Sequence, residues 1–399
     1  MQNFRQKFLL PVLSLLIVGV IGVVLLTGNS DISNAQLSCD DPFNGERAPF
    51  SVSGWETDFC QTTIEFSEVL SGGVPRDGIP PIDAPVFDPI EVATWLQPQS
   101  PVVVVEMGEE ARAYPLAILT RHEIVNDVID GVPVAVTFCP LCNSAMVFDR
   151  RVDDQTLRFG VSGNLRNSDL IMWDDVTQSW WQQLTGEGIV GDYAGRQLTI
   201  LPSLVVGFGE FQQMHPDGQV LSPTTTGRTY GNNPYAGYES RDPRNFLYRG
   251  ELDERLNPTE RVLAGIIDGE PMAYAFSALA EVHVINDTLG ERDVLAMWQP
   301  GAVSALDNQI IDLSVDVGMA ALYDRELDGQ TLTFVYEADT EEIRDEQTGS
   351  VWNVFGEAVS GELAGSRLRQ IIASPHYWFA WAAFHPETPL YVLESTDEE

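Results

Sequence analysis

The chain has 399 residues, enough for two or three domains with sizeable cores. Its formal net charge is −37, from 59 acidic against 22 basic residues, and Lys7 is the only lysine. Because such a surface repels phosphate backbones, we expect no nucleic acid among its partners. An acidic, lysine-poor surface suits a salty or cation-rich exterior. A composition bias shared by a whole lineage is an alternative explanation of the same pattern.

Residues 1–35 have the pattern of a targeting segment. Arg5 and Lys7 form a basic start, and the apolar run Phe8–Thr27 is long enough to span a bilayer. Ser33-Asn34-Ala35 is a small-x-small cleavage site, so we expect either a cleaved signal peptide or a retained N-terminal membrane anchor. The length of the apolar run favours the anchor. The basic start predicts that the remainder is extracytoplasmic, either anchored to the membrane or secreted.

The four cysteines divide into two pairs. Outside the cytoplasm disulfides are allowed, and a bridge between Cys39 and Cys60 would staple the N-terminal arm. That division leaves Cys139 and Cys142, two residues apart, as a pair with its own role.

The chain organisation follows from composition and from an internal repeat. Five segments are expected after the targeting segment: an irregular Pro- and Gly-rich arm at 36–100, a first repeat at 101–217, a loop-rich connector at 218–260, a second, degenerate repeat at 261–388, and an acidic tail at 389–399.

The repeat rests on short motifs that recur in the same order. Three of the matches are Phe148-Asp149-Arg150 with Tyr323-Asp324-Arg325, Trp181 with Trp352, and His215-Pro216 with His385-Pro386. What both copies keep is expected to be scaffold. Cys139, Cys142 and His122 occur only in the first copy, so they are the candidates for a special function.

The hydrophobic pattern predicts a β-rich α+β fold made of two tandem diverged repeats of twisted antiparallel hairpins with short helices. In the first repeat, strands are expected at 101–106, 123–128 and 132–138, and a short helix at 115–122. Asp130-Gly131 is a strong hairpin turn between the last two of these strands. A short helical piece is also expected at 90–96.

The cysteine pair is expected in a loop between two strands. The second copy has an Asp328-Gly329 turn that predicts a hairpin, and by correspondence 145–152 and 155–161 should form one too. A thioredoxin-like site needs a helix after the first cysteine to stabilise its thiolate, so a following strand weakens the thiol–disulfide redox interpretation.

A metal knuckle is the preferred interpretation of Cys139-Pro-Leu-Cys142. Two cysteines on a turn present both sulfurs to one ion, and His122 is the candidate third ligand. Thiolate and imidazole ligands favour zinc or copper. Glu123 is a candidate general base. The expected partner of the site is a metal ion or a small molecule. Two alternatives stay open: a redox enzyme using the same pair, and a surface module with a structural Cys139–Cys142 disulfide.

Purely structural roles are the alternative interpretation for the other polar and aromatic residues. His122 could bind a backbone carbonyl instead, and Glu123 could pair with Arg121. We expect Asn126-Asp127 to form a turn, Asp149-Arg150 an ion pair, and Trp180-Trp181 part of the core.

Several of these motifs together resemble a known family. They are Ala111–Pro115, His122–Asp127, Val136–Cys142, Phe148–Val152 and Ser162–Asp169. The chain from about residue 88 onward is similar to the DUF3179 family of bacterial proteins of unknown function, so the resemblance implies no activity. One departure is Asn143, where the family pattern implies glycine; asparagine can adopt the same backbone.

Overall fold

The computed structural model describes residues 39, 41–43, 45–224, 229–245, 247–391 and 393. Two units are distinguished, Met1–Asp40 and Asp41–Glu399, and every helix and strand described below belongs to the second. The predicted signal peptide or anchor at 1–35 and the end of the acidic tail lie outside the described residues. Among the described residues, no helix combines the length and hydropathy needed to cross a bilayer.

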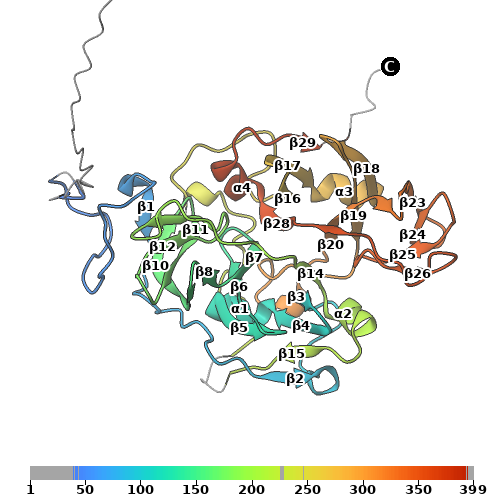
Figure 1. The fold of residues 1–399 in the computed structure, drawn as a ribbon, viewed down its shortest axis with the longest axis horizontal. Coiled ribbons are helices and arrows are strands. Elements are labelled where there is room, and N and C mark those ends of the chain that lie inside the picture. The colour runs from blue at the N-terminus through green and yellow to red at the C-terminus, as the bar shows by residue number, and fades with distance from the viewer. Residues whose placement is uncertain are drawn as a thin grey trace, which may run out of the picture. The chain divides into compact units, whose positions relative to one another are not determined.

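The first half of the second unit contains three main sheets (Figure 1). One has the order β14-β3-β4-β15-β2, with strands Leu204–Gly207, Pro101–Met107, Glu110–Pro115, Gln219–Leu221 and Phe87–Pro89. A second is β5-β6-β7, with strands Ile124–Ile129, Val132–Cys139 and Ser144–Asp149. The third is β1-β10-β11-β12-β13, with strands Val69–Ser71, Phe159–Arg166, Asp169–Asp174, Trp180–Gln182 and Gly188–Val190.

In the second half, the described residues form three sheets of four strands. Their orders are β28-β16-β17-β29, β18-β19-β20-β27 and β23-β24-β25-β26. The bounds are β16 Arg261–Ile267, β17 Glu270–Ala275, β18 Val284–Leu289, β19 Arg292–Gln299, β20 Met319–Asp324, β23 Phe334–Glu337, β24 Glu342–Asp345, β25 Val351–Trp352, β26 Ala358–Ser360, β27 Gln370–Ile371, β28 Ser374–Tyr377 and β29 Leu390–Tyr391.

Short elements complete the described fold. The α-helices are α1 Leu116–His122, α2 Phe208–Met214, α3 Phe276–Val282 and α4 Trp378–Phe384, and the 3-10 helices are η1 Phe66–Glu68, η2 Ile90–Val92, η3 Pro243–Asn245 and η4 Ile311–Leu313. Two two-stranded hairpins are β8 Arg151–Val152 with β9 Gln155–Thr156, and β21 Glu326–Leu327 with β22 Gln330–Thr331. This is the β-rich α+β fold with short helices that the sequence predicts.

The local predictions hold best where the hydrophobic pattern is strong. The strands at 101–106, 123–128 and 132–138 and the helix at 115–122 are confirmed as β3, β5, β6 and α1. The hairpin expected at 145–152 and 155–161 is reduced to β8 and β9, because the next strand, β10, pairs with β11 instead. The piece at 90–96 is helical only over η2.

Two predicted local roles are wrong. Asn126 and Asp127 lie in strand β5 rather than in a turn: Asn126 Nδ2 donates to Phe159 O at 2.8 Å, and Tyr114 OH donates to Asp127 Oδ2 at 2.6 Å. Asp149 pairs with Arg151, whose Nε lies 2.9 Å from Asp149 Oδ1, whereas Arg150 donates to backbone carbonyls.

The core crosses from one half to the other. Strand β28 packs against β7 (Figure 1), and one buried cluster includes Phe138 and Val147 together with Tyr377 and Trp378. The predicted core position of Trp180 and Trp181 is confirmed, since both side chains are fully buried. Cys139, at the end of β6, and Cys142 belong to the same buried cluster, so the cysteine loop is part of this shared core.

Candidate metal centre

The cysteine loop is a tight turn between two paired strands. Strand β6 ends at Cys139, β7 begins at Ser144, and these two residues face each other in the antiparallel register. Inside the turn, Cys142 N–H donates to Cys139 O at 3.2 Å. Asn143 closes the turn with φ 48°, a left-handed conformation that asparagine tolerates better than most residues. The prediction of a loop between two strands is confirmed, and no helix follows the pair.

Asp169 is the third group at the cysteine pair. The ligand atoms of Cys139, Cys142 and Asp169 all lie within 4.8 Å of one another. Asp169 begins β11, directly after a two-residue hairpin turn at Asn167 and Ser168, both of which have positive φ. The Cys139 thiol donates to the carbonyl of Ser168 at 3.7 Å, which ties this turn to the cysteine loop.

The Asp169 carboxylate is held firmly through only one of its oxygens. Oδ2 accepts hydrogen bonds from Gln182 Nε2 at 2.7 Å and from Leu184 N–H at 2.9 Å. Oδ1 is buried and accepts no hydrogen bond of normal geometry within the described part of the chain. A buried carboxylate oxygen without a partner is costly, and a cation would satisfy it.

Burial controls the protonation of all three groups. Cys142 and Asp169 are 0% exposed and Cys139 is 2% exposed. Burial raises the pKa of the Cys139 thiol, and it raises that of Cys142 well above the usual value. Burial also raises the pKa of Asp169 to about 6, although hydrogen bonds from Gln182, from Leu184 N–H and from the Cys142 and Cys139 thiols lower it. The thiols therefore keep their protons at neutral pH unless a cation displaces them.

The chemistry of this donor set fits a thiophilic divalent cation. Two sulfur donors and one carboxylate oxygen are ligand types that zinc accepts. The groups with the largest effects on the pKa values of Cys139, Cys142 and Asp169 are thiols, carboxylates and amides, with no cation among them. Among these groups of the described chain, none carries a positive charge that would stabilise the ionised thiols.

Glu123 lies close to this cluster but not in it. The residue caps α1 with φ 59°. Burial raises the pKa of Glu123 to about 8, although a hydrogen bond from Tyr235 OH, which lies 3.5 Å from Oε1, lowers it. The negative charge of Asp169 raises it further. Glu123 also lines a cavity of about 100 Å³ together with Leu141, Leu170 and Tyr235. A carboxyl group with this pKa can exchange a proton near neutral pH. Its role as a general base stays a prediction.

His122, the predicted third ligand, is directed elsewhere. Its Nδ1 lies 2.7 Å from Pro80 O and its Nε2 lies 2.9 Å from Tyr230 OH. Because Glu123 has a left-handed backbone, the chain changes direction immediately after His122, and the two side chains enter different surroundings. The structure brings Asp169, and not His122, to the cysteines.

Two tyrosines of the connector lie close to the site, a placement that no motif of the sequence predicts. Tyr235 reaches Glu123, and Tyr238 is 3% exposed within the same core cluster as both cysteines. Burial, and then the charges of Cys142 and Cys139, raise the pKa of Tyr238. Backbone hydrogen bonds fix this connector to the loop 300–318, from Asn233 N–H to Gln309 O at 2.9 Å and from Gly237 N–H to Asp307 O at 3.0 Å.

Weak signals for the missed residues existed in the sequence. Asp169 ends the Ser162–Asp169 motif, one of those that carry the family resemblance, and Tyr235 ends the Asn-Pro-Tyr motif of the connector. Neither motif has a spacing that indicates metal binding.

The comparison with protein families settles the relationship of the chain. The family described as "Protein of unknown function (DUF3179)" matches residues 76–388. The chain belongs to the DUF3179 family. No curated protein and no solved structure gives a significant match to it.

The DUF3179 match includes the whole candidate centre. Cys139, Cys142, Asp169 and Glu123 all lie within the matched residues, as does the connector. Cys39 and Cys60, which are disulfide-bonded, lie before the match, whereas Cys139 and Cys142 are free thiols. The two cysteine pairs thus differ both in chemistry and in their relation to the family.

Proposed function

We propose that this DUF3179 protein binds one zinc ion through Cys139 Sγ, Cys142 Sγ and Asp169 Oδ1. The observation that carries the proposal is the convergence of two free buried thiols and a buried carboxylate oxygen without a hydrogen-bond partner among the described residues. Zinc is preferred over copper because the oxygen ligand is a hard donor, whereas copper(I) sites favour sulfur and imidazole. Magnesium and calcium are disfavoured by the thiolates.

The surroundings of the three ligands support a resident ion. Gln182 Nε2 and Leu184 N–H hold Asp169 Oδ2, so the free Oδ1 keeps one orientation. Such outer contacts orient ligands and strengthen metal binding. The positions of the cysteines are fixed by the β6–β7 register and by the left-handed backbone of Asn143. The loop therefore loses little conformational entropy when an ion binds.

A thiol-redox function is the second candidate, because the cysteine pair is free in the structure. Two observations favour the metal over it. Strand β7, and not a helix, follows the pair, and burial raises the pKa of both thiols, whereas redox-active thiols usually have a lowered pKa.

The test is the metal content of the purified chain, measured with its free thiols counted on the same preparation. We expect close to one zinc per wild-type chain and none in a Cys139→Ser/Cys142→Ser variant. The matched control is Ser222→Ala, a change outside the cluster, which should keep the zinc. A wild-type chain that stays metal-free after incubation with zinc, with both thiols countable, would reject the metal proposal. Reduction and reoxidation of the pair would then be measured to examine the redox function.

A further inference from the structure

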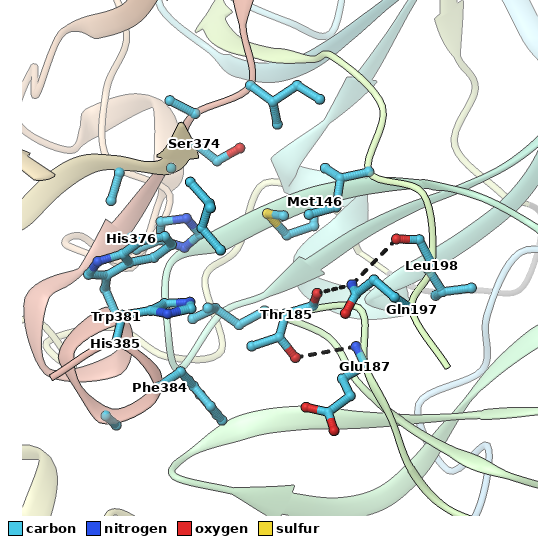
Figure 2. Close-up of a pocket in the computed structure, with 18 of the residues that line it drawn as sticks. Met146, Thr185, Glu187, Gln197, Leu198, Ser374, His376, Trp381, Phe384 and His385 are labelled. Atoms are coloured by element: carbon cyan, nitrogen blue, oxygen red, sulfur yellow. Dashed lines mark hydrogen bonds between the residues drawn. The ribbon is translucent and has the colours of Figure 1, made fainter. Parts of the chain in front are cut away.

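Two of the cavities in the described chain differ in how their amide side chains are paired. The larger has a volume of about 620 Å³ and is lined by residues of both halves (Figure 2). Its Gln197 amide donates to Thr185 O at 2.6 Å and to Leu198 O at 3.4 Å, so this group has partners within the protein. The smaller has a volume of about 100 Å³, lies beside Glu123, and contains an amide that has none.

The smaller cavity adjoins the candidate metal centre without including its ligands. Leu141 and Leu170, which line the cavity, are sequence neighbours of the proposed ligands, but none of the three ligands lines it. The opposite side is formed by the N-terminal arm, where Gly72 N–H donates to Gly163 O at 2.8 Å. Val74 of this arm also lines the cavity and is 36% exposed, so a small molecule can enter from this side.

Asn164 is the unpaired amide of this cavity. The residue belongs to β10 and is 6% exposed. Its backbone N–H donates to Ser162 Oγ at 3.0 Å, whereas its side-chain amide forms no hydrogen bond with any described residue. Buried polar groups in native proteins usually have a partner. An unpaired amide on the wall of a cavity therefore indicates that a ligand or water supplies one.

Glu123 and Tyr235 give the cavity a second polar position. Tyr235 OH lies 3.5 Å from Glu123 Oε1, longer than the roughly 2.5–3.0 Å of a typical O–H···O hydrogen bond, so both groups can still bind another partner. Within the described residues, no basic side chain pairs with Glu123, and burial raises its pKa to about 8. At pH 7 the group is therefore mostly a neutral carboxyl, which donates one hydrogen bond and accepts another.

The rest of the lining is mainly apolar and sets the size of a ligand. Val161, Leu165 and Leu247 line the cavity together with the two leucines beside the proposed metal ligands. A cavity of about 150 Å³ can hold benzene, so about 100 Å³ limits a ligand to roughly four or five non-hydrogen atoms. Such a lining fits one polar group attached to a short alkyl chain.

We propose that this cavity binds a short, neutral aliphatic amide, which hydrogen-bonds Glu123 and Asn164 and whose alkyl group contacts the apolar lining. A primary amide carries two donors and one acceptor, which match a neutral carboxyl on one side and a second amide on the other. The inference goes beyond the proposed zinc ion and does not require it, because the contacts come from residues other than the zinc ligands. Binding is therefore measured with and without zinc.

The experiment uses propionamide as the probe and two analogues of the same size, 2-butanone and isobutylamine. Binding to the full chain is followed by saturation-transfer NMR titration, on zinc-loaded protein and in the presence of a chelator. We expect saturable binding of propionamide in both states, with a dissociation constant on the order of 1 mM for so small a ligand. 2-Butanone lacks the N–H donors and should bind about 3–10-fold more weakly. Isobutylamine is a cation at pH 7 and should also bind more weakly, since its charge loses hydration without meeting an ionised partner.

Three variants locate the site. Val74→Phe narrows the cavity from its exposed side and should weaken propionamide about 10-fold or more, because less room is left for the ligand. Val359→Phe, at an exposed position of β26, is the matched control and should bind like the wild type. Asn164→Leu should reduce the preference for propionamide over 2-butanone. Since its amide has no partner in the described chain, this change should not lower stability in urea unfolding.

Several outcomes would overturn the proposal. These are the absence of saturable propionamide binding, equal binding by the wild type and Val74→Phe, tighter binding of isobutylamine than of propionamide, or binding only to the zinc-loaded chain. A chain that binds propionamide but no zinc would reject the metal proposal alone. Circular dichroism checks that each variant is folded. If Asn164→Leu does not fold, the comparison of Val74→Phe with Val359→Phe and of the three ligands still decides the matter.

Discussion

The backbone N–H of Tyr377 donates a hydrogen bond to the carbonyl of Cys142 at 2.8 Å. Tyr377 ends β28 in the second half of the chain, and Cys142 is in the cysteine loop of the first half. The second half therefore supports the geometry of the candidate centre directly, although none of the three proposed ligands comes from it.

The choice between Asp169 and His122 as third ligand gives the first prediction. Asp169→Asn should lower zinc affinity at least about 100-fold, since loss of an outer contact alone costs 10–100-fold. His122→Gln should keep near-stoichiometric zinc, because its ring nitrogens contact Pro80 and Tyr230. Competition against a chromogenic chelator measures both. If His122→Gln released the ion and Asp169→Asn retained it, the ligand assignment would be wrong.

Glu123 should make the metal-free protein less stable as pH rises. Its folded pKa of about 8 lies above the ordinary value of 4.5. As pH rises, Glu123 therefore ionises first in the unfolded chain. Its stabilising contribution to the free energy of unfolding is complete below pH 4.5 and is lost as pH rises toward 8. Glu123→Gln removes this loss. Its gain over wild type should grow between pH 5 and pH 8 by more than about 1.4 kcal/mol, the value of one pKa unit.

The measurement for Glu123 is chemical denaturation in the presence of a metal chelator at several pH values. Glu254→Gln, at an exposed position, serves as the control and should follow the wild type at each pH. A difference between Glu123→Gln and wild type that does not change with pH would contradict the prediction.

Asn143 should tolerate glycine and reject branched side chains. Its φ of 48° is left-handed, and that conformation costs an ordinary L-residue about 1–2 kcal/mol. We expect Asn143→Gly to keep both zinc and stability, and Asn143→Val to unfold at lower denaturant and to bind zinc more weakly. Equal midpoints for the two variants would show that this backbone does not fix the loop.

Two buried tyrosines allow a matched test of the scaffold. Tyr114 OH donates to Asp127 Oδ2 at 2.6 Å, and Tyr274 OH donates to Asp287 Oδ2 at 2.9 Å. Asp127 is only 7% exposed, while Asp287 is partly exposed. Tyr114→Phe should therefore cost about 1.5–3 kcal/mol, as for a hydrogen bond to a buried charged group, and Tyr274→Phe about 1 kcal/mol or less. Equal losses in urea unfolding would refute this ranking.

The strands and the first helix could be predicted because their signals are local. The Asp130-Gly131 turn and the apolar run at 101–106 define β3, β5 and β6 without reference to distant residues. Long-range pairing is different. Strand β10 pairs with β11 and not with β9. Which strands pair depends on competition between sheets, and no local sequence pattern encodes the outcome.

The candidate centre could be predicted only in part for the same reason. Cys139 and Cys142 have only two residues between them, so the sequence itself predicts that they lie close together. Asp169 reaches them through the two-residue turn at Asn167 and Ser168 and through the packing of one sheet on another. His122 is closer in sequence but is turned away by the left-handed backbone of Glu123.

The complete burial of Cys139, Cys142 and Asp169 has a consequence for when an ion enters. For the proposed ion, we expect entry to require movement of the chain around Tyr235 and Tyr238, which is hydrogen-bonded to loop 300–318. We therefore expect the ion to load before this segment packs and to exchange slowly afterwards. The ion found in the purified protein would thus record which metals were available in the compartment where the chain folded, rather than those of the buffer in which it is later kept.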